Sequence, residues 1–439
     1  MMRGPAQAET MVERTLPMTS GWTRRTVLGL IAAAPALALP GTARAKGGRV
    51  VVVGGGFGGS AAARTIKRLA PGIEVTLVAR DTSFVCCPGS NTVIGGFGRI
   101  EDQTVGYDAL ARDGITVVTG RAEAVDTDAR RLRLADGSVL PYDKLVLSPG
   151  IGFFWDEVEG VSAATVGRIP HAWQAGEQTV LLRRQLEAMP DGGVFALVAP
   201  VGPLRCPPAV GERVSLAAHY FKTAKPKSKI IVFDAKSKFS LQSLFEEAWA
   251  ALYPGMIEYR LAESDGIVRA IDPETRIVST DFDDVTADVV NFIPRQRAGD
   301  IALAAGTADE TGWCPVDPAT FASTRVPHVH VIGDAAFAPP LPKAAATAVS
   351  VAETCAQAVV RDLTQADMPA PRWHAGCYSL AAPGHGFEAS TDFHLANGHI
   401  AIDEATMQRT PEGASAEDLQ AGAEKAELWL RGIMGQVWG

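Results

Sequence analysis

The 439-residue sequence contains few cysteines and no cysteine or histidine pattern that binds a metal. It has no C-x-x-C, and its eight histidines form neither an H-x3-H nor an H-E-x-x-H arrangement. We therefore expect no zinc or iron–sulfur site and no other metal centre. Six cysteines in so long a chain are also too few and too scattered for a disulfide scaffold. They are Cys86, Cys87, Cys206, Cys314, Cys355 and Cys377.

Long hydrophobic runs and an excess of basic residues are missing as well. Beyond residue 45 no apolar run is long enough to span a membrane, so we expect no membrane span in the mature chain. The whole chain has a formal net charge of −8. Residues 1–45 contain five basic and two acidic residues, so their removal lowers the net charge to −11. This balance argues against nucleic acid and anionic membranes as partners, and it is compatible with a basic protein partner.

Residues 1–45 have the pattern of a twin-arginine signal peptide. Arg24 and Arg25 precede an apolar run over residues 27–39, and residues 43–45 form an A-x-A cleavage site. The run is too short for a membrane span and has signal-peptide flanks on both sides, which makes an uncleaved anchor the less favoured alternative. Twin-arginine export carries folded proteins, which suits a protein that acquires its cofactor before export. We expect a periplasmic protein whose mature chain begins at Lys46.

The most informative motif is a glycine-rich loop that directly follows four valines at residues 50–53. The loop matches G-x-G-x-x-G, and its glycines are Gly54, Gly56 and Gly59. An alanine-rich helix over residues 60–69 and a second strand over residues 73–78 follow at the required spacing. This order predicts a dinucleotide site with the pyrophosphate at the helix N-terminus, where N–H groups are unpaired. The alternative is a glycine turn in some other βα unit.

Two later strands are expected to complete the same domain. Residues 144–147 form a strand that ends in Ser148, Pro149 and Gly150, and residues 329–332 form a strand that ends in Gly333 and Asp334. In flavoproteins with two dinucleotide-type domains, the Asp of such a returning strand contacts the flavin ribityl chain. An alanine-rich helix over residues 344–361 follows. The cofactor expected is therefore FAD.

A second α/β segment lies between these two strands. It is expected to contain helices over residues 173–189 and 211–222 and strands over residues 193–199 and 230–233. The fold class is thus α/β, an FAD-binding Rossmann-type domain interrupted by a second nucleotide-fold domain as in glutathione reductase, with a C-terminal α+β region. The expected limits are 1–45 for the signal peptide, 46–165 and 296–368 for the FAD domain, 166–295 for the second domain and 369–439 for a C-terminal interface region.

The second domain lacks the glycine loop that a nicotinamide cofactor needs. Its first strand runs into residues 200–208, which contain four prolines and Cys206. Proline has no N–H donor and has a fixed φ, so this loop cannot form the same pyrophosphate cradle. We expect no use of NAD(P)H, and the cysteine indicates sulfur chemistry in its place.

With these features the chain resembles the flavoprotein subunit of flavocytochrome c sulfide dehydrogenase, a periplasmic family related to the sulfide:quinone oxidoreductases. The resemblance extends over nearly all of the mature chain. The matching segments are residues 170–179, 205–208, 212–213, 225–229, 293–294, 296–299, 312–317, 342–343, 377–379 and the end from 429 to 439.

The resemblance implies roles for three cysteines. Cys87 lies four residues before Asn91 in an S-N-x-V-I-G-G segment, which implies a covalent bond to the flavin 8α-methyl. Cys206 and Cys377 are implied to form a redox disulfide over the flavin ring, with Glu212 as an acid or base nearby. The pair Cys206 with Cys314 is the alternative.

The remaining cysteines are assigned less specific roles. Cys86 is a bystander or a substitute for Cys87, and Cys355 is a structural thiol in an alanine-rich helix. Cys314 is also expected to be a structural thiol, with participation in the sulfur chemistry as the alternative.

Other implied cofactor contacts are less regular. Lys343 matches the family, but the residues that follow it, 344–346, are alanines rather than Ser-Gly-Tyr. The acidic residue that holds the adenosine ribose is replaced by Ala79, so Asp81 is the candidate substitute. The aromatic residue that precedes Glu212 in the family is replaced by Gly211.

The function that the resemblance implies is oxidation of sulfide to sulfur or polysulfide. Hydrosulfide would open the disulfide, and FAD would then pass electrons to a haem on a c-type cytochrome partner. A sulfide:quinone oxidoreductase is the second interpretation. A flavin-carrying assembly protein or sulfur carrier without turnover is the third. A C-terminal apolar stripe that contains Trp429, Ile433 and Trp438 is expected to pack on its own domain rather than on lipid.

Overall fold

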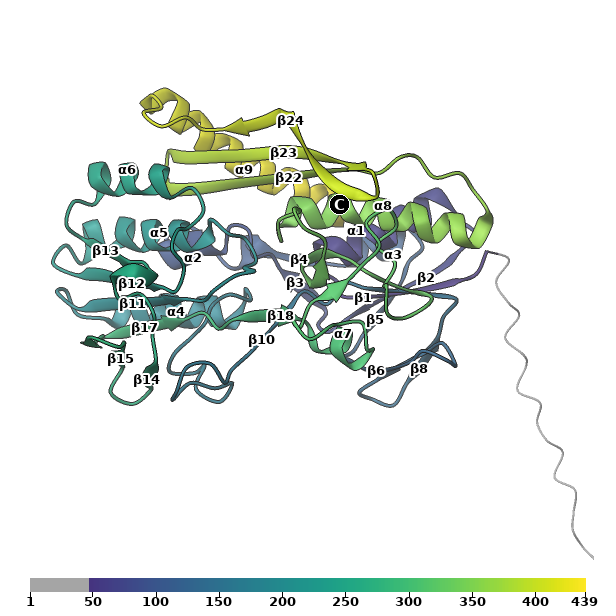
Figure 1. The fold of residues 1–439 in the computed structure, drawn as a ribbon, viewed down its shortest axis with the longest axis horizontal. Helices are drawn as coiled ribbons and strands as arrows, with labels where there is room; N and C mark the ends of the chain where they lie inside the picture. The colour runs from purple at the N-terminus through teal and green to yellow at the C-terminus, as the bar shows by residue number, and fades with distance from the viewer. Residues whose placement is uncertain (1–46) are drawn as a thin grey trace, which may run out of the picture. The chain divides into compact units, whose positions relative to one another are not determined.

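The predicted glycine loop follows the central strand of a five-stranded parallel sheet, whose strand order is β20-β9-β1-β2-β5. The computed structural model shown in Figure 1 describes residues 47–439, so Arg24, Arg25, the A-x-A segment and Lys46 lie outside the described residues. The strands are β1 (Arg49–Val53), β2 (Glu74–Ala79), β5 (Thr116–Thr119), β9 (Lys144–Leu147) and β20 (Val329–Val331). Because β20 returns after the second sheet, the FAD-type domain is interrupted, as predicted.

The four valines of β1 are buried because the strand lies in the middle of this sheet. Continuous apolar runs are typical of parallel strands that are covered on both faces. The helix after the loop, α1 (Phe57–Leu69), begins three residues earlier than predicted because the last glycines of the loop already belong to it. A long helix, α8 (Ala345–Thr364), packs against α1. These elements bring the glycine loop to the carboxyl end of β1.

The second nucleotide-type unit has a four-stranded parallel sheet in the order β13-β12-β11-β17. Its strands are β11 (Val194–Ala199), β12 (Lys229–Asp234), β13 (Ile257–Arg260) and β17 (Val289–Phe292), and its helices are α4 (Glu177–Ala188), α5 (Ala209–Ala224) and α6 (Gln242–Leu252). Helix α4 begins four residues later than predicted because Ala172 and Gly176 have positive φ, which no right-handed helix accepts.

A small antiparallel sheet extends this unit. Its strands are β14 (Ala270–Asp272), β15 (Ile277–Ser279) and β16 (Asp284–Thr286). Buried residues of β14 and β15 share an apolar cluster with the strands β11, β12 and β17.

The C-terminal region consists of a three-stranded antiparallel sheet and one helix, the yellow elements of Figure 1. The elements are β22 (Arg372–Ala382), β23 (His385–Ala396), β24 (His399–Arg409) and α9 (Ala416–Trp438). Ser415 and Asp418 form a capping box that starts α9. The helix lies against β22, β23 and α1, and the side chains of Ile433, Val437 and Trp438 are buried. The apolar stripe of the C-terminus therefore packs on the protein itself.

The short elements connect these layers. In the first half they are β3 (Ser83–Val85), α2 (Ser90–Gly95), η1 (Glu101–Gln103), β4 (Thr104–Gly106), α3 (Asp108–Arg112), β6 (Ala122–Asp126), β7 (Arg131–Leu134), β8 (Val139–Pro141) and β10 (Ile151–Phe153). In the second half they are η2 (Ala262–Ser264), β18 (Gln296–Ala298), α7 (Asp300–Ala304), β19 (Cys314–Pro315), η3 (Gly333–Ala335) and β21 (Ala336–Phe337).

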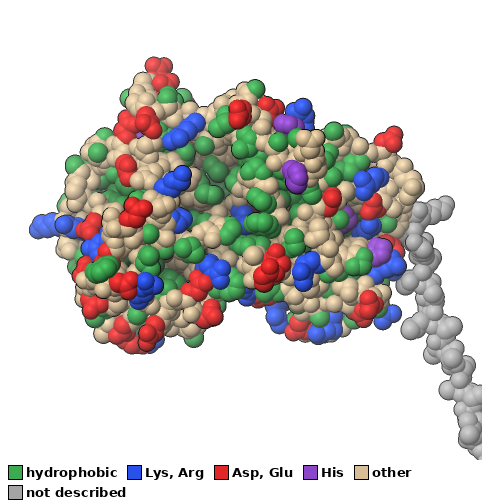
Figure 2. Space-filling view, in the orientation of Figure 1, with side chains coloured by type: hydrophobic (Ala, Val, Ile, Leu, Met, Phe, Trp, Pro, Cys, Tyr) green, Lys and Arg blue, Asp and Glu red, His purple; other side chains and the backbone are tan. Residues whose placement is uncertain are grey.

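The α/β fold class is confirmed. The described residues, 47–439, cluster into one compact unit, so the expected limits at 165, 295 and 368 stay predictions. Among residues 47–439, no helix has both the length and the apolar character needed to cross a membrane. On the face shown in Figure 2, acidic and basic side chains are mixed around the margin, and hydrophobic side chains gather toward the middle, where the face is hollowed.

Candidate functional site

The geometry of the G-x-G-x-x-G loop requires glycine at two of its three positions. Gly54 has φ of +111°, and a Cβ there would overlap the carbonyl oxygen of Ser148. A Cβ at Gly59 would overlap the carbonyl oxygen of Gly54. A Cβ at Gly56 would meet only the ring of Phe84, at 3.3 Å. The backbone of the chain therefore does not itself require glycine at position 56, which leaves room there for the approach of a ligand.

The N-terminus of α1 presents an anion site behind this loop. Its N-cap residue, Gly56, has an extended backbone and offers no side-chain cap, and the first turn contains no acidic residue. The first N–H groups of a 13-residue helix are thus left without a side-chain acceptor, beside the positive end of the helix dipole. A pyrophosphate group fits this arrangement.

Aromatic side chains surround the loop, which the sequence did not predict. The ring of Phe84 stacks on Trp438 at 5.4 Å between centroids, and Phe57 meets both rings edge-on. The indole N–H of Trp438 donates to the hydroxyl of Ser60 at 3.1 Å. The end of α9 therefore reaches the glycine loop from the far end of the chain. The apolar stripe was visible in the sequence, but nothing in it indicated this destination.

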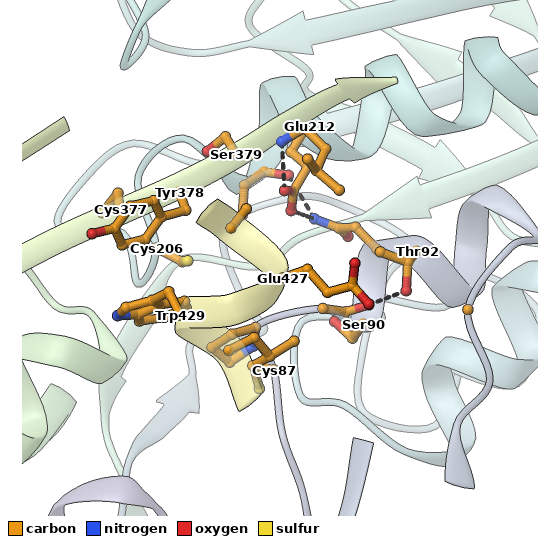
Figure 3. A pocket seen from close by; sticks show the side chains of 18 of the residues that line it. Cys87, Ser90, Thr92, Cys206, Glu212, Cys377, Tyr378, Ser379, Glu427 and Trp429 are labelled. Carbon is orange, nitrogen blue, oxygen red and sulfur yellow. Dashed lines mark hydrogen bonds between the residues drawn. The ribbon is translucent and has the colours of Figure 1, made fainter. Parts of the chain in front are cut away.

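A cavity of about 840 Å³ lies where segments from distant parts of the chain meet (Figure 3). These segments include the stretch that enters α2, the loop before α5 with its first turn, the middle of β22, and α9. The predicted site residues that line it are Cys87, Cys206, Glu212 and Cys377. Lining residues that the sequence did not predict include Asn91, Arg205, Arg213 and Trp429. The structure thus brings together the residues to which the resemblance assigns chemistry.

Cys206 and Cys377 lie as free thiols on this cavity. Burial raises the pKa of the Cys206 thiol well above its usual range, and the charges of Cys377 and Glu212 add to the effect. Burial raises the pKa of Cys377 to about 11, again with a contribution from Glu212. Cys206 has φ of +54°, and its N–H donates to the carbonyl of Lys343 at 2.7 Å. Both thiols line the same cavity, and ionisation of Cys377 would disfavour ionisation of Cys206.

Glu212 faces both thiols from the first turn of α5. One carboxyl oxygen accepts from the side-chain amide of Asn91 at 2.7 Å, and the other accepts from the Leu380 N–H at 3.0 Å. Burial is the largest influence on the carboxyl and raises its pKa, and these two hydrogen bonds and the charge of Arg213 offset part of that rise. Glycine precedes Glu212 because the ring of Phe245 fills that space: a Cβ at Gly211 would lie 2.7 Å from it.

The other four cysteines divide into one that lines the cavity and three that do not. Cys87 is half-buried and lines the cavity, whereas the neighbouring Cys86 is fully buried in the core. Burial raises the pKa of Cys86 and also that of Cys355 inside α8. Cys314 is buried with its sulfur 3.4 Å from the hydroxyl of Thr307, and burial raises its pKa to about 11. Cys314 is not among the residues that line the cavity.

Arg205 links Cys87, Cys206 and Asp334. Its guanidinium lies 3.7 Å from the Asp334 carboxylate. Burial lowers the pKa of Arg205, but the ionised forms of Cys87, Asp334 and Cys206 outweigh it, so the pKa is raised. Its backbone N–H donates to the side-chain oxygen of Gln296 at 2.8 Å. Sequence analysis quoted Arg205 within a matching segment but assigned it no role. The only available signal was its position directly before Cys206.

Asp334 and Lys343 lie together after β20. Gly333 and Asp334 are in η3, and the Lys343 ammonium donates to the carbonyls of Asp334 and Ala336 at 2.7 and 2.8 Å. The same ammonium lies 3.7 Å above the ring of Trp313. Burial lowers the pKa of Lys343 to about 8.

The remaining predicted contacts lie beside the glycine loop rather than on the cavity. Pro149 and Gly150 follow β9, and the carbonyl of Gly150 accepts from the Gly299 N–H at 3.0 Å. Asp81 is exposed after β2 and pairs with Arg80 at 3.0 Å. Its charge helps raise the pKa of Tyr107, whose ring packs against the loop.

The residues present fit FAD. Besides the glycine loop and the anion site, two buried polar atoms of cavity-lining residues have no partner among the described residues: the Trp173 indole N–H and the Gln103 side-chain oxygen. One is a donor and the other an acceptor, which suits a flat heteroaromatic ring that carries both kinds of group. Within residues 47–439 no group of three or more His, Cys, Asp or Glu is arranged to hold a metal ion.

Comparison with known families covers most of the described chain. Residues 48–181 match the family described as pyridine nucleotide-disulphide oxidoreductase. Residues 179–294 match the central part of the family described as sulfide dehydrogenase [flavocytochrome c] flavoprotein chain, and residues 369–438 match the flavin-binding part of flavocytochrome c sulphide dehydrogenase.

Individual relatives agree with these matches. The chain is 60% identical over 45 residues to a sulfide dehydrogenase [flavocytochrome c] flavoprotein chain of Chlorobaculum thiosulfatiphilum, covering 10% of this chain and 94% of the relative's sequence. It is 32% identical over 102 residues to a sulfide-quinone reductase of Aquifex aeolicus, covering 23% of this chain and about a quarter (24%) of that protein.

A solved structure shares the fold. The sulfide:quinone oxidoreductase of Aquifex aeolicus superposes with a TM-score of 0.68 at 18% identity, covering 89% of this chain and 91% of the other. With the matched central and flavin-binding segments and the Chlorobaculum relative, the chain belongs to the family of flavocytochrome c sulfide dehydrogenase flavoprotein chains.

Proposed function

We propose that the chain is the FAD-carrying subunit of a periplasmic sulfide dehydrogenase. It oxidises sulfide to sulfur or polysulfide through a Cys206–Cys377 disulfide and passes the electrons to a c-type cytochrome. The observation that carries the proposal is that Cys206, Cys377 and Glu212 line the same cavity as Cys87, although they come from distant parts of the sequence. Family membership supports sulfide as the substrate.

The cysteines perform the sulfur chemistry. Hydrosulfide attacks one sulfur of the disulfide, so one S–S bond breaks and a new one forms. One cysteine then carries a persulfide and the other is released as a thiolate, so the pair is reduced by two electrons while the sulfide sulfur is oxidised. Glu212 accepts the hydrosulfide proton. Its two oxygens accept hydrogen bonds that stabilise the ionised carboxylate, and this carboxylate lies near the thiols. FAD supplies a two-electron acceptor that can release electrons singly to a haem.

Several residues would hold the cofactor. Gly54, Gly56 and Gly59 would cradle the pyrophosphate, Asp334 and Lys343 would contact the flavin, and Cys87 would be the covalent attachment point. The cavity position of Cys87 and the burial of Cys86 support this choice of cysteine. No NAD(P)H is required, because the loop after β11 contains prolines where a nucleotide needs N–H donors.

One steady-state comparison tests the proposal. Protein purified from the periplasm is mixed with sulfide and either cytochrome c or a soluble quinone analogue. We expect faster reduction of cytochrome c. A preference for quinone would favour the sulfide:quinone oxidoreductase alternative, and no turnover with flavin bound would favour a sulfur or flavin carrier.

Serine variants test the sulfur chemistry. Cys206→Ser and Cys377→Ser should each abolish sulfide-dependent bleaching of the flavin, while the flavin stays bound and reducible by dithionite. Cys355→Ser is the matched control, because that thiol is buried in α8 away from the cavity. A sulfide-active Cys377→Ser variant, or a linked 206–314 peptide in unreduced protein, would overturn the assignment.

A further inference from the structure

A chain of buried hydrogen bonds joins α5 to α2 at the wall of the cavity. Arg213 is 2% exposed and Asn91 is 4% exposed. Arg213 directly follows Glu212 in α5, yet its side chain does not pair with that carboxylate or with any other carboxylate among residues 47–439. Instead, its Nε donates to the side-chain oxygen of Asn91 at 3.0 Å. An arginine buried without an acid partner is costly, so its hydrogen bonds must serve as compensation.

The other donors of Arg213 are also engaged. Nη1 donates to the side-chain oxygen of Asn291 at 2.8 Å and to the carbonyl of His171 at 3.1 Å, and Nη2 donates to the carbonyl of Ala172. A guanidinium can only donate. The oxygen of the Asn91 amide must therefore face Arg213, which fixes the orientation of the amide without any assumption about its hydrogens.

The orientation of Asn91 determines what Glu212 receives. With its oxygen turned to Arg213, Asn91 presents its NH₂ group to Glu212 Oε2 at 2.7 Å and to the Ala209 carbonyl at 3.2 Å. The other carboxyl oxygen, Oε1, accepts from the Leu380 N–H at 3.0 Å. Both oxygens thus face obligatory donors, which is the arrangement that stabilises a carboxylate rather than a carboxylic acid.

We infer that Asn91, oriented by Arg213, is a positioning residue that holds Glu212 as an ionised proton acceptor beside Cys206 and Cys377. The inference rests on the role of Glu212 in the proposed function. It extends the proposed function by giving Asn91 a role of its own, beyond its place in the sequence segment that identifies Cys87. The Asn91 amide links the buried guanidinium of Arg213 to the carboxylate of Glu212, although the two charged groups form no direct ion pair.

Opposing influences act on Glu212 from each element around it. Burial opposes ionisation, whereas the Arg213 charge from α5, the Asn91 amide from α2 and the Leu380 N–H from β22 favour it. Cys206 in the loop before α5 and Cys377 on β22 are the titratable groups that sense its charge, and that charge raises the pKa of both thiols. Loss of the Asn91 amide should therefore raise the pKa of Glu212, because one of two donors to the carboxylate disappears.

The experiment compares Asn91→Leu with the natural protein over a range of pH. A base works only when ionised, so the rate of sulfide-dependent flavin reduction falls as pH drops through the pKa of Glu212. We expect Asn91→Leu to move this acid limb upward by about one pH unit, which lowers the rate about tenfold at a pH below the limb. Asn91→Asp, which keeps the shape but adds a carboxylate beside Glu212, should move the limb in the same direction and serves if Asn91→Leu does not fold.

A second readout needs no sulfide turnover. The rate of iodoacetamide alkylation of Cys377 in reduced protein, followed by peptide mass spectrometry, should show a step where Glu212 ionises, because the carboxylate raises the thiol pKa. Asn91→Leu should shift the step upward, and Glu212→Gln should remove it. Asn397→Asp is the control: it makes the same kind of change at an exposed turn between β23 and β24. It should leave both profiles unchanged.

The outcomes separate this inference from the proposed function. If Glu212→Gln removes the acid limb and the alkylation step while Asn91→Leu and Asn91→Asp leave both unmoved, the role of Asn91 is wrong and the proposed function stands. If Glu212→Gln retains normal sulfide oxidation, the proposed role of Glu212 is wrong. The alkylation step alone then decides whether Asn91 controls the ionisation of Glu212.

Discussion

Two loops of this protein occupy the same topological position and differ in chemistry. Each follows the first strand of its parallel sheet and leads into a helix: the glycine loop between β1 and α1, and the segment 200–208 between β11 and α5. The first loop contains glycines that no other residue can replace without overlap. The second contains four prolines and Cys206. The first loop has the backbone geometry of a phosphate site, and the second presents Cys206 to the cavity.

The difference lies in the backbone rather than in the sheet. A glycine loop approaches its helix closely and leaves N–H donors free, which suits an anion. A proline-rich loop loses those donors and gains a fixed shape, which can hold a side chain in place. Here that shape gives Cys206 a positive φ and anchors its N–H on the carbonyl of Lys343. The same α/β unit therefore presents N–H groups without a side-chain acceptor in one domain and a cavity-lining thiol in the other.

The largest expected effect comes from adding one methyl group to the glycine loop. Gly59→Ala should destabilise the fold by about 3 kcal/mol and abolish flavin retention, because the added Cβ overlaps the Gly54 carbonyl. Gly202→Ala is the matched control in the second loop, where the added Cβ would meet only the Leu204 N at 3.9 Å. Thermal unfolding and the flavin-to-protein ratio measure both effects. Equal losses in the two variants would contradict the difference between the loops.

Covalent attachment should distinguish two adjacent cysteines. Denatured natural protein should keep its flavin and fluoresce on a gel, whereas Cys87→Ser should release the flavin into an acid supernatant. Cys86→Ser should retain it, because that thiol is buried away from the cavity. Release from Cys86→Ser instead would move the attachment point by one residue. Complete release from the natural protein would contradict a covalent bond altogether.

Addition of NADH tests the chemistry assigned to the second loop. We expect NADH to leave the flavin oxidised over the time in which sulfide reduces it fully, because segment 200–208 offers few N–H donors for a pyrophosphate. Anaerobic spectra of the flavin with each reductant provide the measurement. Rapid reduction by NADH would mean that segment 200–208 supports nucleotide binding, as the glycine loop is expected to do.

The smallest expected effect concerns the cation beside Cys206. The charge of Arg205 lowers the pKa of this thiol, while burial and the neighbouring acidic groups raise it. Arg205→Gln should therefore raise the pKa further and leave less thiolate at a given pH. Alkylation of Cys206 at pH 8 should slow by about tenfold or less. Arg205→Lys should restore part of the rate, and an unchanged rate in Arg205→Gln would show that Arg205 acts only on Asp334.

Features set by neighbouring residues could be predicted from the sequence. The strand–glycine loop–helix order, the proline-rich second loop and the strand that leads into Asp334 all depend on residues within a few positions of one another. Backbone sterics and hydrogen-bonding capacity act at that range, so the α/β class and the interrupted FAD-type domain followed from the chain alone. Element ends were less certain: α4 begins late because two positive φ values precede it.

The composition of the site depends on the tertiary structure. Resemblance to a family named Cys206, Cys377 and Glu212, but only the fold shows that Asn91 lies between Glu212 and Arg213 and that Arg205 faces Asp334.

The same holds for α9, whose apolar stripe predicted packing but not a wall of the cavity or a contact between Trp438 and Ser60. Local sequence thus determined which backbone shapes and chemical groups are available. The packing of distant segments decided which groups meet, because contacts across hundreds of residues leave no periodic trace in the chain.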